Sequence, residues 1–202
     1  MSTFRLEHAV PHILARPLVI AIVLMLATPT FAADFTITGA ETNPQVLNSA
    51  DDTGVIEAGG TLTVGALEDA IDVIGSDNTI TNNGAITAGN IGIYSSPTAT
   101  NATITNIGTI TSASGDGILS LGAKATITNS GTINADDGIY STGDDATITN
   151  SGSIDAGDDG IHSIGAKAII TNSGTIDADD DGIASTGAKA IITNSGTIDA
   201  AD

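Results

Sequence analysis

Aspartates recur at one position of a repeating unit, just before a glycine and a short apolar segment. If the units are layered as in a sheet, equivalent carboxylates stack about 5 Å apart and repel one another. Calcium takes carboxylate and carbonyl oxygens readily and would relieve that repulsion. The residues are Asp116, Asp137, Asp159 and Asp181, with Asp69 equivalent before Ala70, with Asp136, Asp158 and Asp180 beside three of them, and a further column of Asn134, Asp155, Asp177 and Asp199.

The simpler interpretation of these residues is solvated turn aspartate, because Asp favours glycine-flanked bends. The GGxGxD nonapeptide of calcium-binding β-rolls is also absent from the chain. Weak calcium binding stays open as the alternative. We therefore predict no metal-ligating residue and no cofactor.

Paired carboxylates could also serve a glycosidase, in which two of them flank one bond. A catalytic site should interrupt the repeat, whereas these aspartates obey it. The chain has no cysteine, and after residue 32 it has no arginine and only one histidine, His162. We predict no catalytic residue and no enzyme. A polysaccharide-acting enzyme is the disfavoured alternative.

Two more columns carry polar side chains. An asparagine recurs in every ITN segment, and we expect these amides to form a structural ladder at a bend rather than a ligand site. Lys124, Asp145, Lys167 and Lys189 share another position, and we expect a weak surface charge ladder there. The asparagines are Asn82, Asn106, Asn129, Asn150, Asn172 and Asn194.

Threonines flank the isoleucine of the same segment in four TxT rows. The rows are Thr79/Thr81, Thr103/Thr105, Thr126/Thr128 and Thr147/Thr149, after which Ile169 and Ile191 replace the first threonine. Such rows would suit an ice-binding face. The high β-propensity of threonine on an exposed strand explains them more simply.

The elements that position all these residues follow from the repeat. The heptad ITNSGTI occurs three times, and glycines at 60, 84, 108, 131, 152, 174 and 196 recur every 21 to 24 residues. Each unit holds three strand-like segments, for example 125–129, 131–135 and 138–142, with alternating side chains around one isoleucine. Gly131 is expected to let the chain turn.

This pattern predicts an all-β fold, a right-handed, single-stranded parallel β-helix with about 22 residues and three short strands per coil. A β-sandwich would not need equivalent residues at a fixed spacing. A left-handed hexapeptide helix would show a six-residue subdivision, which is absent.

The composition excludes some partners. The chain has 24 acidic and 5 basic residues, a formal net charge of −19. No basic face exists to neutralise phosphates, so a nucleic-acid partner is excluded and an anionic membrane surface is disfavoured. Aromatic residues, at 2%, are too few to predict carbohydrate stacking.

The N-terminal segment differs from the rest of the chain. Basic residues precede an apolar run at 18–27 and then small residues, as in a secretory signal peptide. We predict a signal peptide over residues 1–32, cleaved near Ala32 or alternatively after Ala33. Residues 33–59 are expected to form an N-terminal cap or entry segment, and 60–202 the β-helix repeats. The repeat stops without a capping segment, so we expect a fragment of a longer protein.

With its signal peptide, its lack of cysteine and its repeated ITNSGTI units, the chain resembles the passenger region of Gram-negative autotransporters, the type V secreted proteins. The resemblance implies a β-helical stalk or adhesin, secreted or exposed at the cell surface. It implies a ligand on a host or neighbouring cell, and a C-terminal β-barrel translocator that this chain lacks. The resemblance supplies no active-site motif. A calcium-stabilised extracellular binding module remains the alternative function.

Overall fold

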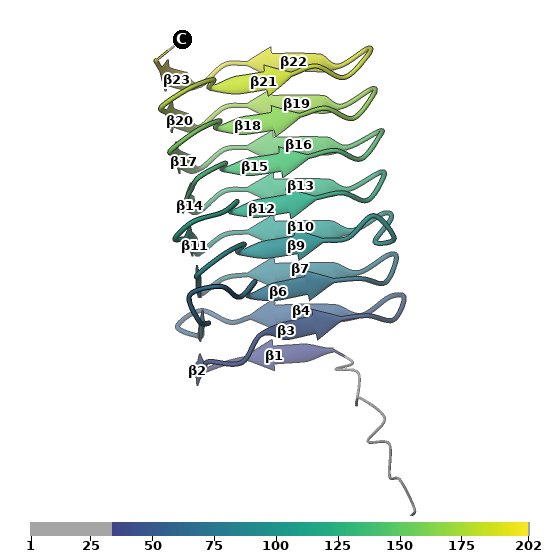
Figure 1. Cartoon of the computed structure of the whole chain (residues 1–202), viewed down its shortest axis with the longest axis vertical. Coiled ribbons are helices and arrows are strands. Elements are labelled where there is room, and N and C mark those ends of the chain that lie inside the picture. Colours follow the sequence, from purple (N-terminus) through teal and green to yellow (C-terminus); the bar gives the residue numbers. More distant parts are fainter. Residues whose placement is uncertain (1–33, 202) are drawn as a thin grey trace, which may run out of the picture. The chain divides into compact units, whose positions relative to one another are not determined.

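The computed structural model describes residues 34–201, and these form a parallel β-solenoid of about 22 residues per coil (Figure 1). The signal peptide predicted for residues 1–32, with its cleavage near Ala32, lies outside the described residues. Within them every regular element is a strand, and the strands pair in three parallel sheets. The predicted fold class is confirmed.

The chain visits the three sheets in turn, and each coil contributes one strand to each. Sheet A contains β1 (Phe35–Ile37), β4 (Thr53–Ile56), β7 (Thr79–Asn82), β10 (Thr103–Asn106), β13 (Thr126–Asn129), β16 (Thr147–Asn150), β19 (Ile169–Asn172) and β22 (Ile191–Asn194). Sheet B contains β2 (Ala40–Glu41), β5 (Thr61–Thr63), β8 (Ala85–Ala88), β11 (Thr109–Ser112), β14 (Thr132–Ala135), β17 (Ser153–Ala156), β20 (Thr175–Ala178) and β23 (Thr197–Ala200).

Sheet C contains β3 (Gln45–Leu47), β6 (Ile71–Val73), β9 (Ile93–Ser95), β12 (Ile118–Ser120), β15 (Ile139–Ser141), β18 (Ile161–Ser163) and β21 (Ile183–Ser185). In Figure 1 the nearer strands of sheet C and the fainter strands of sheet A run in opposite directions as the chain rises, and the winding is right-handed.

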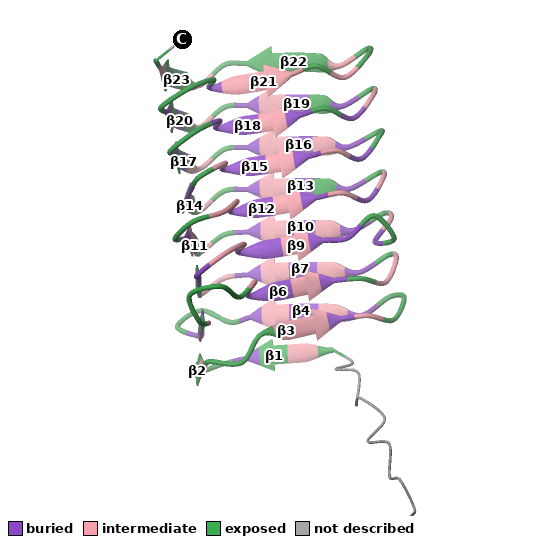
Figure 2. Ribbon diagram, viewed as in Figure 1, coloured by how far each residue is buried: buried purple, intermediate pink, exposed green. Residues whose placement is uncertain are grey.

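Equivalent residues pair across every step of the stack. Ile104 lies opposite Ile80 on one side and Ile127 on the other, and the same holds for the isoleucines of sheets B and C. The isoleucines from Ile80 to Ile170 in sheet A are fully buried. In Figure 2 buried residues recur along the strands from one coil to the next, and β22 is exposed. Each buried isoleucine contributes about 2–3 kcal/mol, so the three columns hold the coils together.

The coils begin further toward the N-terminus than the glycine spacing indicated. Strands β1 to β3 already pair with β4 to β6, within the segment predicted as a cap or entry. Gly54 occupies the position of the isoleucine column in β4, and the ring of Phe35 fills the space: a Cβ on Gly54 would lie 2.5 Å from Phe35 Cε1. The first coils therefore lack the isoleucine at this position, and the isoleucine periodicity of the sequence does not reveal them.

The predicted asparagine ladder is confirmed. Asn129 Nδ2 donates to Asn150 Oδ1 at 2.8 Å, and its own Oδ1 accepts from Asn106 Nδ2 at 2.8 Å. Five such bonds, 2.7 to 2.9 Å long, link Asn82 through Asn194. The amides from Asn82 to Asn172 are fully buried, so the ladder is structural and presents no ligand surface.

The glycine of the NxG motif has a different role from the one predicted. Gly131 does not adopt a positive φ, so it is not needed for an unusual turn. Instead, a Cβ there would lie 2.0 Å from the carbonyl oxygen of Gly108 in the preceding coil. Glycine recurs at this position because the backbones of neighbouring coils approach too closely for any side chain.

Candidate functional site

The acidic turns between sheets B and C connect neighbouring coils. Asp137 Oδ1 accepts the backbone N–H of Asp159 at 3.0 Å, and Asp159 Oδ1 accepts the backbone N–H of Asp181 at 3.0 Å. Near the N-terminus Asp69 Oδ1 accepts the N–H of Ile91 at 3.1 Å. These aspartates therefore satisfy turn amides of the next coil, a structural role that the sequence pattern alone did not show.

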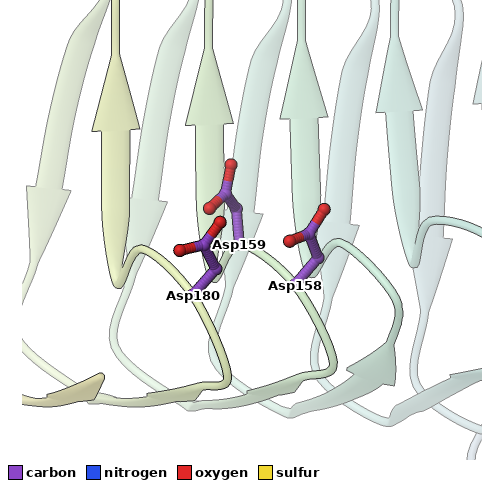
Figure 3. Close-up of side chains that lie close together, drawn as sticks. All are labelled: Asp158, Asp159 and Asp180. Atoms are coloured by element: carbon purple, nitrogen blue, oxygen red, sulfur yellow. The ribbon is translucent and has the colours of Figure 1, made fainter. Parts of the chain in front are cut away.

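Three carboxylates of these turns converge. Asp158, Asp159 and Asp180 each place an oxygen within 4.8 Å of the other two, and Figure 3 shows them on the turns of two successive coils. Asp159 is buried, and the other two are exposed. Calcium takes six to eight oxygen ligands, so this cluster could supply part of a coordination sphere. The cluster contains members of both predicted turn columns, but Asp116, Asp137 and Asp181 lie outside it.

Burial raises the pKa of two aspartates in the turns that lead into sheet C. Burial raises the pKa of Asp116 to about 6, and the charges of Asp137 and Asp136 add to the rise. Burial likewise raises the pKa of Asp137. On sheet C, burial and the neighbouring charge of Asp69 raise the pKa of Asp72. Part of the repulsion in the stack is therefore relieved by proton uptake in mildly acidic solution.

His162 has a partner that the sequence analysis missed. Its Nδ1 lies 2.9 Å from Asp159 Oδ2, and its ring stacks on Tyr140 with centroids 4.8 Å apart and an interplanar angle of 23°. The carboxylate fixes the ring orientation, an arrangement that leaves Nε2 as the nitrogen able to bind a metal. The D-x-x-H spacing of Asp159 and His162, three residues apart on the way into β18, is the signal that could have identified the pair.

Sheet B carries an open acidic groove of about 430 Å³ on its outer side. Asp155 and Asp177 are opposite each other on β17 and β20, as predicted for this column, and Asn134 Nδ2 donates to Asp155 Oδ2 at 2.9 Å. The groove is lined by Ser112, Ala113, Ser114, Asn134, Ala135, Asp136, Asp155, Ala156, Gly157, Asp177 and Asp179. Its lining side chains suit hydrogen-bond donors or cations rather than anions.

The column of three lysines and one aspartate shares an unusual backbone conformation in addition to its charges. Lys167 Nζ lies 3.3 Å from Asp145 Oδ1, on an exposed surface where such a pair contributes little. Lys124, Asp145, Lys167 and Lys189 all have φ between 59° and 65°, in the left-handed region. The turn before each sheet A strand imposes this conformation, and the same position holds Asp51, Asp77 and Asn101 in earlier coils.

The four predicted TxT rows lie together on the outer face of sheet A. Thr79, Thr103, Thr126 and Thr147 are paired in one column, and the second threonines of each row form another. Among residues 34–201, no hydrogen bond to another protein group engages the hydroxyls of these eight threonines. Among those same residues, no helix has the length and apolar character needed to cross a membrane.

Comparison of the chain with protein-family models, with curated proteins and with solved structures gives no significant match. The fold and its internal repeat therefore define the class of protein, a parallel β-solenoid with asparagine and isoleucine ladders inside and acidic turns outside.

Proposed function

We propose that the chain is a structural stalk or adhesin-type segment, secreted or exposed at the cell surface, and of the kind that autotransporters present as a passenger. The observation that carries this proposal is the unbroken register of the coils, with equivalent residues paired at every step of sheet A. Each coil adds about 4.8 Å along the stack, so a repeat of this kind extends a surface away from its anchor.

The placement of the chemically active side chains supports a structural function over catalysis. The asparagines bond to each other, and the turn aspartates bond to backbone amides of the next coil. The partner of such a stalk would be a ligand on a host or neighbouring cell. A net charge of −19 keeps the outer surface hydrated and disfavours nucleic acid as a partner.

Localisation tests this proposal. Antibodies raised against the chain should label intact cells, or detect the protein in the medium, without permeabilisation. Labelling that requires permeabilised cells would contradict it. A panel of glycans should show no turnover; turnover that is lost on Asp159→Asn but kept on Asp177→Asn would instead favour a polysaccharide-acting enzyme.

A second candidate function is a calcium-stabilised extracellular binding module, and the convergence of Asp158, Asp159 and Asp180 favours it. Binding to the folded state alone raises stability in proportion to the logarithm of the free calcium concentration. The melting temperature should then rise in millimolar calcium for the wild type and for Asp155→Asn/Asp177→Asn, but not for Asp158→Asn/Asp180→Asn. An unchanged wild-type melting curve would exclude this candidate.

A further inference from the structure

The outer face of sheet A is chemically uniform over seven coils. Two columns of side chains point outward from β4 to β22, and they pair in register at every step. We call these fourteen residues the threonine face: Thr53, Thr79, Thr103, Thr126, Thr147, Ile169 and Ile191 in one column, and Val55, Thr81, Thr105, Thr128, Thr149, Thr171 and Thr193 in the other. Every member is β-branched and none is charged.

The fold does not require this uniformity. The strands of sheet B have the same register, yet their central outward column changes from Thr63, Thr87 and Thr111 to asparagine and then to aspartate. The outward column of sheet C is more varied still, with Asp72, Tyr94, Leu119, Tyr140, His162 and Ala184. The other outward column of sheet B stays uncharged, and its members are Thr61, Ala85, Thr109, Thr132, Ser153, Thr175 and Thr197. Only on sheet A are both outward columns uncharged and β-branched. A preference of threonine for strands would act on all three sheets, so it does not explain this difference.

The geometry of the threonine face is a regular two-dimensional array. Neighbouring coils repeat at about 4.8 Å, and outward residues along one strand repeat at about 6.6 Å. Sheets normally twist by about 20–25° per strand, but Figure 1 shows the strands of sheet A stacked without visible fanning. The face therefore has little twist, and the internal asparagine ladder, which ends each of its strands from β7 on, ties its neighbouring coils together by hydrogen bonds.

We propose that the threonine face binds ice. Ice is an uncharged lattice with oxygen rows at repeats close to those of the array, and it cannot adapt its shape to a binder. A face of little twist with regularly placed hydroxyl and methyl groups matches it, because the hydroxyls can join the lattice hydrogen bonds while the methyl groups lie between them. The lack of charge on this face is complementary to ice, since a charged group would have to be dehydrated there.

Charge also argues against the other occupant of such a face, a second copy of this chain. Two chains of net charge −19 repel one another. Acidic side chains on sheets B and C also keep the rest of the surface in contact with liquid water. The proposal is independent of the stalk function, because a face can bind ice whether or not the chain is displayed on a cell.

The test is partition of the full chain into slowly growing ice, with two matched double variants. Thr105→Lys/Thr128→Lys places two stacked lysines at the centre of the threonine face. Thr87→Lys/Thr111→Lys places two stacked lysines on the outer face of sheet B and changes the net charge equally. We expect the wild type and the sheet B variant to be enriched in the ice fraction, and the sheet A variant to be depleted about tenfold or more.

Melting temperatures and a serine variant control for loss of folding in the lysine variants. Melting temperatures of both variants check that each is folded, and Thr105→Ser/Thr128→Ser, which keeps the hydroxyls and removes the methyl groups, should lose several-fold of the partition if the lysine variant does not fold. Exclusion of the wild type from ice, or equal loss in both lysine variants, would overturn the proposal. A wild-type dimer that only Thr105→Lys/Thr128→Lys dissociates, without ice enrichment, would overturn it in favour of self-association.

Discussion

From β7 on, sheets A and B are built from four-residue strands that pair in parallel with the strands of neighbouring coils, yet the two sheets differ inside and outside. Each sheet A strand from β7 to β19 ends in a buried asparagine, whereas the sheet B strands from β14 on end in alanine. On the outside, sheet A presents an uncharged face and sheet B an acidic groove. Stacking therefore fixes the residue types of the inner columns, while the outer columns are free to vary and can carry function.

An asparagine-to-aspartate substitution should give the largest difference between the two sheets in its effect on the free energy of unfolding. Asn129→Asp replaces a buried amide donor by a carboxylate that faces Asn150 Oδ1 and the carbonyl of Ser153. An uncompensated buried charge of this kind should lower the free energy of unfolding by about 3–5 kcal/mol. Urea denaturation followed by circular dichroism measures it.

The matched control is Asn134→Asp on sheet B, where the side chain is exposed and donates to Asp155. It makes the same chemical change, and we expect it to alter the free energy of unfolding by less than about 1 kcal/mol. Equal effects of the two substitutions would mean that the ladder of sheet A is not a special structural element.

A glycine-to-alanine substitution should lower the free energy of unfolding where neighbouring coils are in close backbone contact, and should have little effect on a turn with free space. In Gly131→Ala the new Cβ would lie 2.0 Å from the carbonyl oxygen of Gly108, so the two coils must separate. We expect a loss of about 1–3 kcal/mol in the free energy of unfolding.

Gly157→Ala, on a turn that lines the groove of sheet B, places its Cβ 3.6 Å from Asp136 Oδ1, an ordinary contact. We expect a change below about 0.5 kcal/mol. If Gly131→Ala were tolerated as well as Gly157→Ala, the close approach of the coils would not be the reason for the recurring glycine.

The smallest expected effect concerns the turns that lead into sheet C. The pKa of Asp116 is raised from 3.8 to about 6, so its ionisation costs folding stability. That cost is absent in acid, develops as the pH rises from about 4 to 6, and is complete above about 6. Because Asp116 is only partly buried, we expect Asp116→Asn to stabilise the protein by about 1 kcal/mol at pH 7.5 and by much less at pH 4.

Asp177→Asn, which removes one exposed charge from sheet B, is the control for Asp116→Asn. Melting curves at the two pH values should show a pH-dependent gain for Asp116→Asn that exceeds the gain for the control. A gain for Asp116→Asn that is as large at pH 4 as at pH 7.5 would contradict the assignment of the raised pKa to this residue.

The sequence predicted the fold because stacking forces equivalent residues into columns, and columns appear as a spacing along the chain. The isoleucine columns and the asparagine ladder were predicted in this way. The first coils were missed because Phe35 and Gly54 fill the core by a different exchange of volumes. The role of Gly131 was misjudged, since a short distance between coils leaves the same glycine in the sequence as a turn would.

The candidate sites were harder to predict, because they depend on which outward columns meet. The sequence identified the aspartate columns, but their bonds to amides of the next coil depend on side-chain direction. It identified Asp159 and His162 separately but not their contact, because the repeat predicts contacts between coils and this contact lies within one coil. It identified the TxT rows and placed their end at Ile169 and Ile191. In the structure Val55, Ile169 and Ile191 lie in the same two outward columns as the threonines, because the register of the strands, rather than threonine itself, places a residue in a column.

Buried side-chain amides on sheet A hold the coils in register. Hydrogen exchange of side-chain amides, followed by NMR, tests it most directly within one molecule. The Nδ2 protons of Asn106, Asn129 and Asn150 should exchange orders of magnitude more slowly than those of exposed Asn134, because they open only when coils separate. Exchange of the Asn129 amide as fast as that of Asn134 would contradict the account.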